Sequence, residues 1–154
     1  MNAGDVMTKL FHTLKPDDTI VDAVNAFKTA GEATGKKVFG MMVIDEEDHL
    51  VGMLSMYDIL LYIQPRHAYI WSEMEEDVDP DLFSGILAKV RSITVADLMS
   101  TDVVTITPDT HVMVIVDIMI KRHIRRLPVI SDSNIVGIVY MSDLFYHLLH
   151  EILV

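Results

Sequence analysis

The stretch that decides the fold is Thr13-Leu14-Lys15-Pro16-Asp17, because the second half of the chain repeats it as Thr105-Ile106-Thr107-Pro108-Asp109. In both places a short segment around a threonine ends at a proline and an aspartate follows, which predicts a strand, a turn and the start of a helix. Further pairs match in the same order: Asp5-Val6-Met7-Thr8 with Asp97-Leu98-Met99-Ser100, and Gly52-Met53-Leu54 with Gly137-Ile138-Val139. Matches that keep one order along 154 residues indicate an internal repeat.

Each repeat is expected to form a strand, a helix, two strands and a second helix. Aspartate and threonine at residues 17–19 and 109–110 offer oxygen atoms that cap the start of the first helix. Apolar runs at 38–44 and 127–130 predict buried strands, each followed by a polar turn, a second strand and a helix from about residue 56 or 141. Helical spacing predicts one buried face on each first helix. The apolar residues with that spacing are Ile20, Val24 and Phe27, then Val112, Val116 and Met119.

The predicted fold class is α/β, with two β-α-β-β-α repeats. A crossover helix favours parallel pairing of the strands it joins, and both helices would cover one face of a three-stranded sheet. One such unit is too small to bury an adequate core alone, so we expect two copies packed with pseudo-twofold symmetry and two equivalent clefts between them. The boundaries are residues 1–63 for the first repeat, 64–92 for an acidic and helical connecting segment, and 93–154 for the second repeat.

Composition limits the functions that the chain can have. Its formal net charge is −11, which disfavours binding to nucleic acid and to acidic membrane surfaces. It has no cysteine, which excludes thiolate nucleophiles and thiolate metal sites and suits a reducing cytoplasm. The N-terminus shows no signal peptide, and no phosphate-binding loop or nucleophile elbow occurs in the sequence. We therefore expect a cytoplasmic protein that is not an enzyme.

The order of elements and the repeated motifs resemble a pair of cystathionine-β-synthase-type (CBS) domains, whose tandem form is the Bateman module. The resemblance rests on the two threonine–proline–aspartate stretches, on Arg125-Arg126-Leu127-Pro128-Val129-Ile130, and on the glycine-to-aspartate stretches at 52–58 and 137–143. It implies a regulatory module that needs no cofactor and binds an adenosyl ligand, such as AMP, ADP, ATP, S-adenosylmethionine or a dinucleotide, in the cleft between the repeats. It also implies a homodimer, and we expect the signal to pass to a partner protein in trans.

Two residues carry the expected ligand contacts in the first repeat. In the family, the residues matching Ser55 and Asp58 contact a phosphate and the ribose hydroxyls. A helix start suits a phosphate because its first amides are unpaired. The alternative is a capping box, in which Ser55 and Asp58 only satisfy the helix start. Thr13 lies beside the strand that meets the adenine in relatives, although a strand hydroxyl in solvent is an equal alternative.

The second repeat departs from this pattern, because Tyr140 occupies the position of Ser55 while Asp143 is kept. The tyrosine would fill the phosphate site or stack on a base, so the first repeat is the stronger candidate. Arg125 and Arg126 would fork onto phosphate oxygens, whereas Lys121 and Arg122 are assigned to the end of the preceding helix. Thr105 corresponds to Thr13. The competing function is a structural module for dimerisation or partner docking, with degenerate ligand sites.

Other acidic and histidine patterns are not expected to bind metal. Residues 77–81 alternate carboxylates but lack the glycine and the glutamate of a calcium loop. His147 and His150 lie one helical turn apart without a third ligand, so solvent exposure is expected for both. In the connecting segment, Pro80 is expected to begin a helix. Its apolar face would be formed by Phe83, Ile86, Leu87 and Val90.

Overall fold

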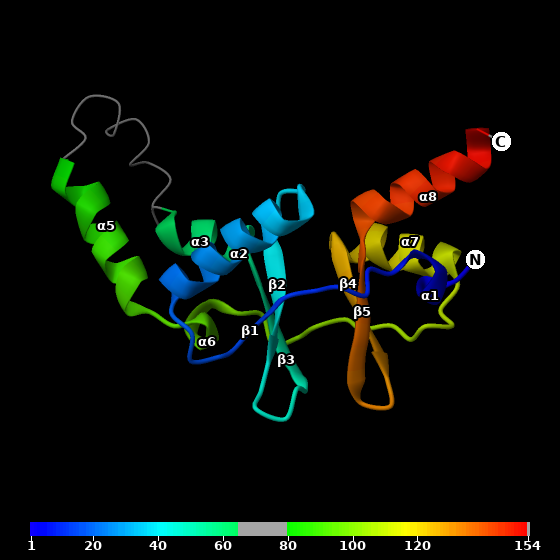
Figure 1. Ribbon diagram of the computed structural model, residues 1–154. Helices are drawn as coiled ribbons and strands as arrows, with labels where there is room; N and C mark the ends of the chain where they lie inside the picture. The colour runs from blue at the N-terminus through cyan, green and yellow to red at the C-terminus, as the bar shows by residue number, and fades with distance from the viewer. Residues whose placement is uncertain (65–79, 154) are drawn as a thin grey trace. The chain divides into compact units, whose positions relative to one another are not determined.

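The computed structural model describes residues 1–64 and 80–153, and its elements follow the predicted order in the first repeat and, except for the first strand, in the second (Figure 1). The acidic part of the connecting segment, including residues 77–79, lies outside the described residues. The elements of the first repeat are α1 (Ala3–Val6), β1 (Thr13–Leu14), α2 (Ile20–Thr34), β2 (Gly40–Ile44), β3 (Leu50–Ser55) and α3 (Met56–Ile63). They are followed by α5 (Pro80–Ser92), α6 (Val95–Leu98), α7 (Val112–Arg122), β4 (Arg126–Ser131), β5 (Asn134–Tyr140) and α8 (Met141–Leu153).

The two sheets differ in one strand. Strands β1, β2 and β3 form a sheet in that order, and β1 runs parallel to β2 with Thr13 opposite Met42, as the crossover helix predicts. In the second repeat β4 pairs antiparallel with β5, and the expected first strand is reduced to a parallel bridge between Ile106 and Val129. The prediction of a third strand is therefore wrong there, because the turn that begins at Thr107 takes the chain away after one residue.

The first helices of the two repeats begin differently. Helix α2 follows Thr19, whose hydroxyl accepts from the Asp22 amide at 3.1 Å while the Asp22 carboxylate accepts from the Thr19 amide at 3.0 Å. Helix α7 follows His111, whose Nδ1 accepts from the amide of Met113 at 3.1 Å. The expectation that residues 109–110 cap α7 is wrong, because both side chains bond Thr107 within the preceding turn. Two hydrogen bonds hold the pKa of the Asp109 carboxyl below its ordinary value. The larger effect comes from the Thr107 hydroxyl and the smaller from a backbone amide.

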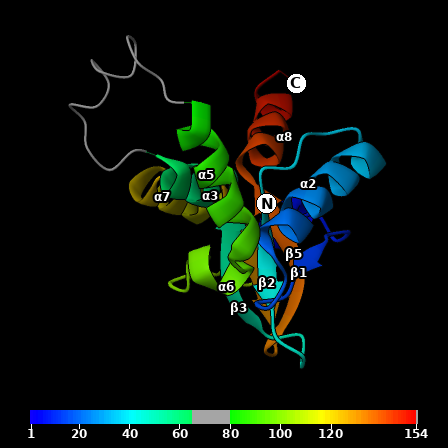
Figure 2. The same ribbon diagram turned by 90° about the vertical axis from the view of Figure 1, so that its left-hand side faces the viewer.

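Small residues replace some of the expected core residues on the helices. Ile20 is buried on α2, but Val24 is 49% exposed and the buried positions beside Ile20 are alanines at 23 and 30. On α7, Ile115 is buried and Val116 only partly so. Helix α5 begins at Pro80 as predicted and packs on α2 (Figure 2), yet Phe83 is 59% exposed. Alanine lets a helix approach its neighbour closely, which a pattern of large apolar residues does not indicate.

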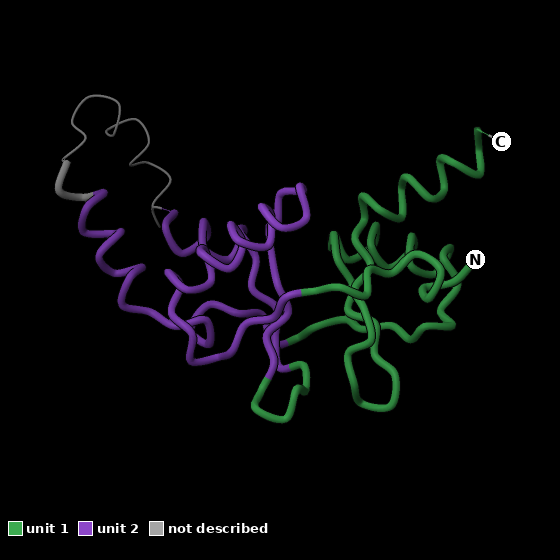
Figure 3. The backbone as a smooth tube through the Cα atoms, in the orientation of Figure 1, with its two compact units in different colours: residues 1–11, 45–50, 102–154 green, residues 12–44, 51–101 purple. Residues whose placement is uncertain are grey.

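The described chain divides into two compact units, shown in Figure 3. Unit 1 contains Met1–Phe11, Asp45–Leu50 and Asp102–Val154, and unit 2 contains His12–Ile44 and Val51–Thr101. Each unit has its own core cluster of buried apolar side chains. The segment that begins each repeat therefore packs with the strands of the other repeat. We call Met1–Phe11, which belongs to unit 1, the first leading segment. Residues 93–101, which belong to unit 2, are the second leading segment.

Equivalent hydrogen bonds hold both leading segments. In unit 1, the amide of Thr8 donates to the carbonyl of Ile138 at 2.8 Å and the Ile138 amide donates back at 3.0 Å. In unit 2, Met53 and Ser100 exchange the same two bonds at 2.9 and 2.8 Å. The carbonyl groups of Pro108 and Pro16 also accept from α1 and α6, respectively. The repeated proline motif thus anchors a leading segment as well as turning the chain.

A close backbone approach explains the glycine in each of these strands. A Cβ atom placed on Gly137 would lie 2.7 Å from the Sδ atom of Met7, and one on Gly52 would lie 2.7 Å from that of Met99. Such separations are far inside van der Waals contact, so within each unit a glycine of one repeat and a methionine of the other repeat fit together by shape. Separately, no helix within residues 1–64 or 80–153 has the length and apolarity needed to cross a bilayer.

Candidate functional site

In unit 2, Ser55 and Asp58 form a hydrogen-bonded corner where β3 passes into α3. The Asp58 Oδ2 atom accepts from the Ser55 amide at 2.9 Å and from the Ser55 hydroxyl at 3.0 Å, and the Ser55 Oγ accepts from the Asp58 amide at 3.3 Å. The expected capping box is therefore present, and both side chains are half-buried. Among the described residues these bonds use Oδ2 only, which leaves Oδ1 able to accept from a bound molecule.

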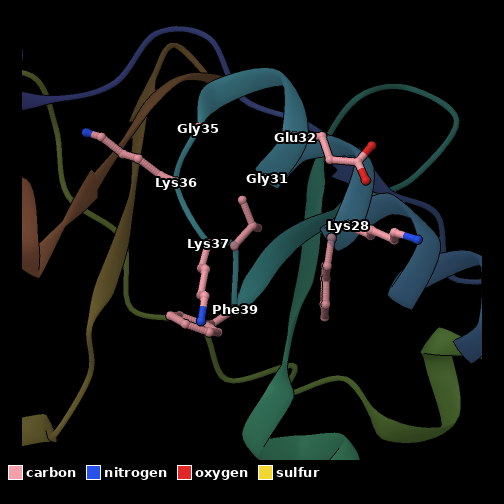
Figure 4. Close-up of a pocket in the computed structure, with 9 residues that line it drawn as sticks. Lys28, Gly31, Glu32, Gly35, Lys36, Lys37 and Phe39 are labelled. Atoms are coloured by element: carbon pink, nitrogen blue, oxygen red, sulfur yellow. The ribbon is translucent and has the colours of Figure 1, made fainter.

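A groove lined with lysines lies next to this corner. It has a volume of about 420 Å³ and is formed by the end of α2 and the chain leading into β2 (Figure 4). The Phe39 carbonyl accepts from the Met56 amide at 2.7 Å, which joins the groove to the start of α3. In Figure 4 Lys36 extends away from Lys37 and Phe39. The lining residues are Phe27, Lys28, Gly31, Glu32, Gly35, Lys36, Lys37, Val38 and Phe39.

This groove has the chemistry of a site for an anion with an apolar part. Three lysines and one glutamate line it, in a protein whose net charge is −11. The two phenylalanine rings provide an apolar surface, and pockets for small ligands commonly combine such surfaces with a few charged groups. Because Gly35 ends α2 in the left-handed conformation with φ 70°, the two lysines that follow it leave the helix; both line the groove, and the side chain of Lys37 points toward Phe39.

In unit 1, three of the predicted residues gather at the end of β5. Arg126 and Tyr140 are cross-strand partners in the β4–β5 ladder, and Asp143 lies in the first turn of α8. The pKa of the Tyr140 phenol is raised, first because burial disfavours the phenolate and also by the charge of Asp143, while the charge of Arg126 acts in the opposite direction. The Asp143 Oδ2 atom also accepts from the Thr8 hydroxyl at 3.3 Å. The corner equivalent to Ser55–Asp58 therefore contains a guanidinium and a phenol.

The remaining predicted site residues are Thr13, Thr105 and Arg125. Thr13 is half-buried in β1, and Thr105 is exposed one residue before the Ile106 bridge. Arg125 is exposed, and its carbonyl accepts from the Met141 amide at 2.8 Å as the Phe39 carbonyl does from Met56. Hydrogen bonds or electrostatic contacts therefore link Ser55 with Asp58, and Tyr140 with Arg126 and Asp143; none joins Thr13 or Thr105 to them among the described residues.

The structure describes the surroundings of the lysine, arginine and histidine side chains that the sequence analysis did not assign to a ligand. Lys121 pairs with Asp117 at 3.0 Å along α7, and Arg122 lies in the last turn of that helix. His147 and His150 are both exposed, as expected. No group of three potential metal ligands occurs within the described ranges. The alternating carboxylates at residues 77–81 fall largely outside those ranges.

Two features of the candidate sites are not identified from the sequence. Thr8 belongs to a repeated motif, but its contact with Asp143 depends on a leading segment that packs in the other repeat's unit. The groove is indicated only by the neighbouring lysines at 36 and 37. Helical spacing places Phe27 in the core, whereas the structure shows that it also lines the groove.

Comparisons with known proteins agree on one family. The family model described as CBS domain matches residues 3–65 and 95–150. An inosine-5'-monophosphate dehydrogenase from Methanocaldococcus jannaschii is 27% identical over 143 residues, which cover 92% of this chain and 22% of that protein. The chain thus spans about a fifth of the length of this curated relative.

Solved structures show the same fold. CBSX2, a CBS-pair protein from Arabidopsis thaliana solved in complex with AMP, has a TM-score of 0.72 and 25% identity, with 97% of each chain covered. The CBS domain pair of protein MJ0100, solved with 5-methylthioadenosine and S-adenosyl-L-methionine, has a TM-score of 0.70 and 20% identity, with 98% of each chain covered. The predicted fold is confirmed, and the chain belongs to the CBS domain family.

Proposed function

We propose that this chain is a regulatory module that senses an adenine nucleotide, with AMP, ADP and ATP as the first candidates and S-adenosylmethionine as a further one. The observation that carries the proposal is the Ser55–Asp58 corner beside the lysine-lined groove in unit 2. The half-buried carboxylate keeps Oδ1 for the hydroxyl groups of a ribose, and the groove offers ammonium groups to the phosphates. The AMP complex of CBSX2 supports this ligand class.

Arg126, Tyr140 and Asp143 in unit 1 are proposed to form a second ligand site. A carboxylate at the equivalent position supports contact with ribose hydroxyls, and Arg126 beside it supports contact with a phosphate. Thr13 on β1, Thr105 beside the Ile106 bridge and the exposed Arg125 directly before β4 are proposed as secondary contacts, because the family resemblance assigns ligand contacts to these positions. The unit 2 site remains the stronger candidate, because its helix start keeps the small hydroxyl of Ser55.

Calorimetric titration of the purified chain with each ligand tests the proposal. We expect at least one adenosyl ligand to bind more tightly than about 100 µM, which corresponds to roughly 5–6 kcal/mol. Asp58→Asn should weaken that binding by about tenfold or more, because hydrogen bonds to a charged acceptor are worth roughly 1.5–3 kcal/mol. Lys37→Ala should weaken ATP more than adenosine if the groove receives phosphates.

Asp97 provides a matched control for Asp58. Its Oδ2 atom accepts from the amide and the hydroxyl of Thr94 at 2.9 and 3.1 Å, which reproduces the capping box of Ser55 and Asp58 at the start of α6. Asp97→Asn should therefore lower stability like Asp58→Asn and leave ligand affinity within about twofold. Absence of binding by every adenosyl ligand, or equal effects of the two substitutions on affinity, would overturn the proposed function.

A structural role in dimerisation is the second candidate, and the outer faces of two helices support it. Leu60 and Leu61 on α3 and Phe145 and Tyr146 on α8 occupy equivalent positions in the two repeats, and all four are exposed. We propose that these helices contribute to a homodimer, because one repeated apolar pattern on the surface is what a self-complementary interface requires. Sedimentation of wild type, Leu60→Lys and Phe145→Lys tests this, with the exposed His147→Lys as control.

Signalling without catalysis completes the proposal. We propose that ligand binding alters the affinity of the module for a partner protein in trans, in the cytoplasm, and that the chain itself does not turn the nucleotide over. A nucleotide shifts such an equilibrium only if it binds one state better than the other. Release of phosphate from ATP that disappears in Asp58→Asn would contradict this part of the proposal.

A further inference from the structure

Thr8 connects the first leading segment to the carboxylate of the proposed unit 1 site. Its hydroxyl donates to Asp143 Oδ2 at 3.3 Å, and its amide and carbonyl pair with Ile138 on β5. The next two residues, Lys9 and Leu10, are exposed, Leu10 by 89%. Thr8 is therefore where this anchored segment ends, and its side chain touches a group that the proposed function assigns to the ligand.

The rest of the segment is held independently of Asp143. Ala3 and Val6 are buried in the unit 1 core, and the amides of Ala3 and Gly4 donate to the carbonyls of Thr110 and Pro108 at 2.8 Å each. Loss of the Thr8 hydroxyl contact would loosen the end of the segment and leave α1 in place. A local opening of this kind has a definite boundary, which amide exchange can locate.

We propose that Thr8 is a positioning residue through which occupancy of Asp143 is passed to the first leading segment. The inference rests on the proposed function. A ribose hydroxyl pair donates to both oxygens of a carboxylate and so competes with the Thr8 hydroxyl for Oδ2. At 3.3 Å the Thr8 bond is long for a hydroxyl donor, and it is the contact that gives way when a ligand approaches. The freed end of the leading segment is then the signal.

Unit 2 is not expected to respond in this way. Ser100 occupies the position of Thr8 and has the same backbone pairing, with Met53, but Asp58 accepts from Ser55 in the adjacent turn. Those two bonds are 2.9 and 3.0 Å long and lie within one capping box. A ligand at Asp58 can therefore bind without displacing a bond from the second leading segment.

The test uses the full chain with Asp58→Asn in the background, so that AMP binding reports the Asp143 site. Hydrogen exchange of the Thr8 and Ile138 amides is measured with and without saturating AMP. We expect exchange of both amides to rise about fivefold on AMP binding, while the amides of Ala3 and Gly4 stay protected. In Thr8→Val, exchange should be raised already without AMP and change by less than about twofold on its addition.

The affinity for AMP distinguishes a positioning role of Thr8 from a purely structural one. Because AMP no longer has to displace the Thr8 hydroxyl, Thr8→Val should bind AMP about 3- to 10-fold more tightly, whereas a structural defect alone would not tighten binding. Thr8→Ser should behave as wild type, and Ser100→Val is the matched control that should leave both readouts unchanged. If AMP binds but Thr8→Val matches wild type in affinity and exchange, this inference fails and the proposed function stands. If no adenosyl ligand binds wild type, both fail.

Discussion

Placing a methyl group on Gly137 tests how the first leading segment is held. The Cβ atom of Gly137→Ala would lie 2.7 Å from Met7 Sδ, 2.9 Å from Met7 Cγ and 3.1 Å from the Thr8 carbonyl oxygen. Two of these atoms belong to a side chain that can rotate, and the backbone oxygen needs to move only by a few tenths of an ångström. Overpacking of this size costs about 1–3 kcal/mol. We expect about 2 kcal/mol, or a fall of roughly 4–8 °C in melting temperature.

The equivalent substitution at Gly52 should be harder to compensate. Its Cβ atom would lie 2.7 Å from Met99 Sδ and 2.9 Å from the Ser100 carbonyl oxygen, which is backbone held by paired hydrogen bonds to Met53. Shortening the methionine therefore removes most of the conflict at Gly137 but not at Gly52. We expect Met7→Ala to recover about 1 kcal/mol of the Gly137→Ala penalty, and Met99→Ala to recover less than about 0.5 kcal/mol at Gly52.

Two double-mutant cycles measured by urea denaturation provide the numbers. Each cycle uses wild type, the glycine-to-alanine variant, the methionine-to-alanine variant and the double variant, and its coupling energy is the compensation described above. Gly31→Ala serves as a control for a packed glycine outside the leading segments, on helix α2. Equal coupling energies in the two cycles would refute the predicted difference between Gly137 and Gly52, and a neutral Gly137→Ala would show that the close contact with Met7 does not hold the first leading segment.

Three further predictions concern single positions. Ser55→Ala should lower the free energy of unfolding by about 1 kcal/mol through loss of the α3 cap, measured by urea denaturation, and Ser55→Thr should restore most of it. Because the folded-state pKa of Tyr140 is raised, the neutral phenol contributes its full stability below the unfolded-state pKa near 10, and this contribution is lost as pH rises above that value. Tyr140→Phe should therefore lose less stability than wild type between about pH 9 and pH 11. An equal loss in both proteins would refute the raised pKa of Tyr140. His123 ends α7 with φ 54° where Gly35 ends α2, so His123→Gly should raise stability by about 0.5–1 kcal/mol in thermal unfolding, and a destabilised variant would contradict this.

The sequence is most informative where backbone chemistry repeats. The prolines, glycines and aspartates of the motifs recur because each position serves the backbone in a specific way. Pro16 and Pro108 accept from a leading segment, and Gly52 and Gly137 admit a methionine. Each of these roles acts on the backbone close to the residue itself, so the order of the elements and the parallel pairing of the first strand could be predicted from the motifs. The core faces were less so, because an alanine that lets a helix approach has no apolar signature distinct from a solvent-facing alanine.

The candidate site was predictable only in part, for a different reason. Ser55 with Asp58, and Tyr140 with Asp143, are close in sequence, so a helix start brings them together. The contact of Thr8 with Asp143 joins residues far apart along the chain. It requires that the first leading segment pack beside β5, and no periodicity within the segment indicates which repeat it joins. Such contacts come from topology, which the pattern of a single sequence specifies weakly.

The same topology explains how the two corners can differ without harm to the fold. The leading segments are held by backbone amides and carbonyls, and by a methionine against a glycine, and none of these contacts involves residue 55 or 140. A serine or a tyrosine can therefore occupy that position while Asp58 and Asp143 keep their places in the first turn of a helix. In unit 2 the Asp58 carboxylate accepts from Ser55 at its own helix start, and in unit 1 the Asp143 carboxylate accepts from Thr8 of the leading segment and lies beside a phenol and a guanidinium. Under the proposed function, the corner with Ser55 would hold a ligand and the corner with Tyr140 would also report its arrival through Thr8.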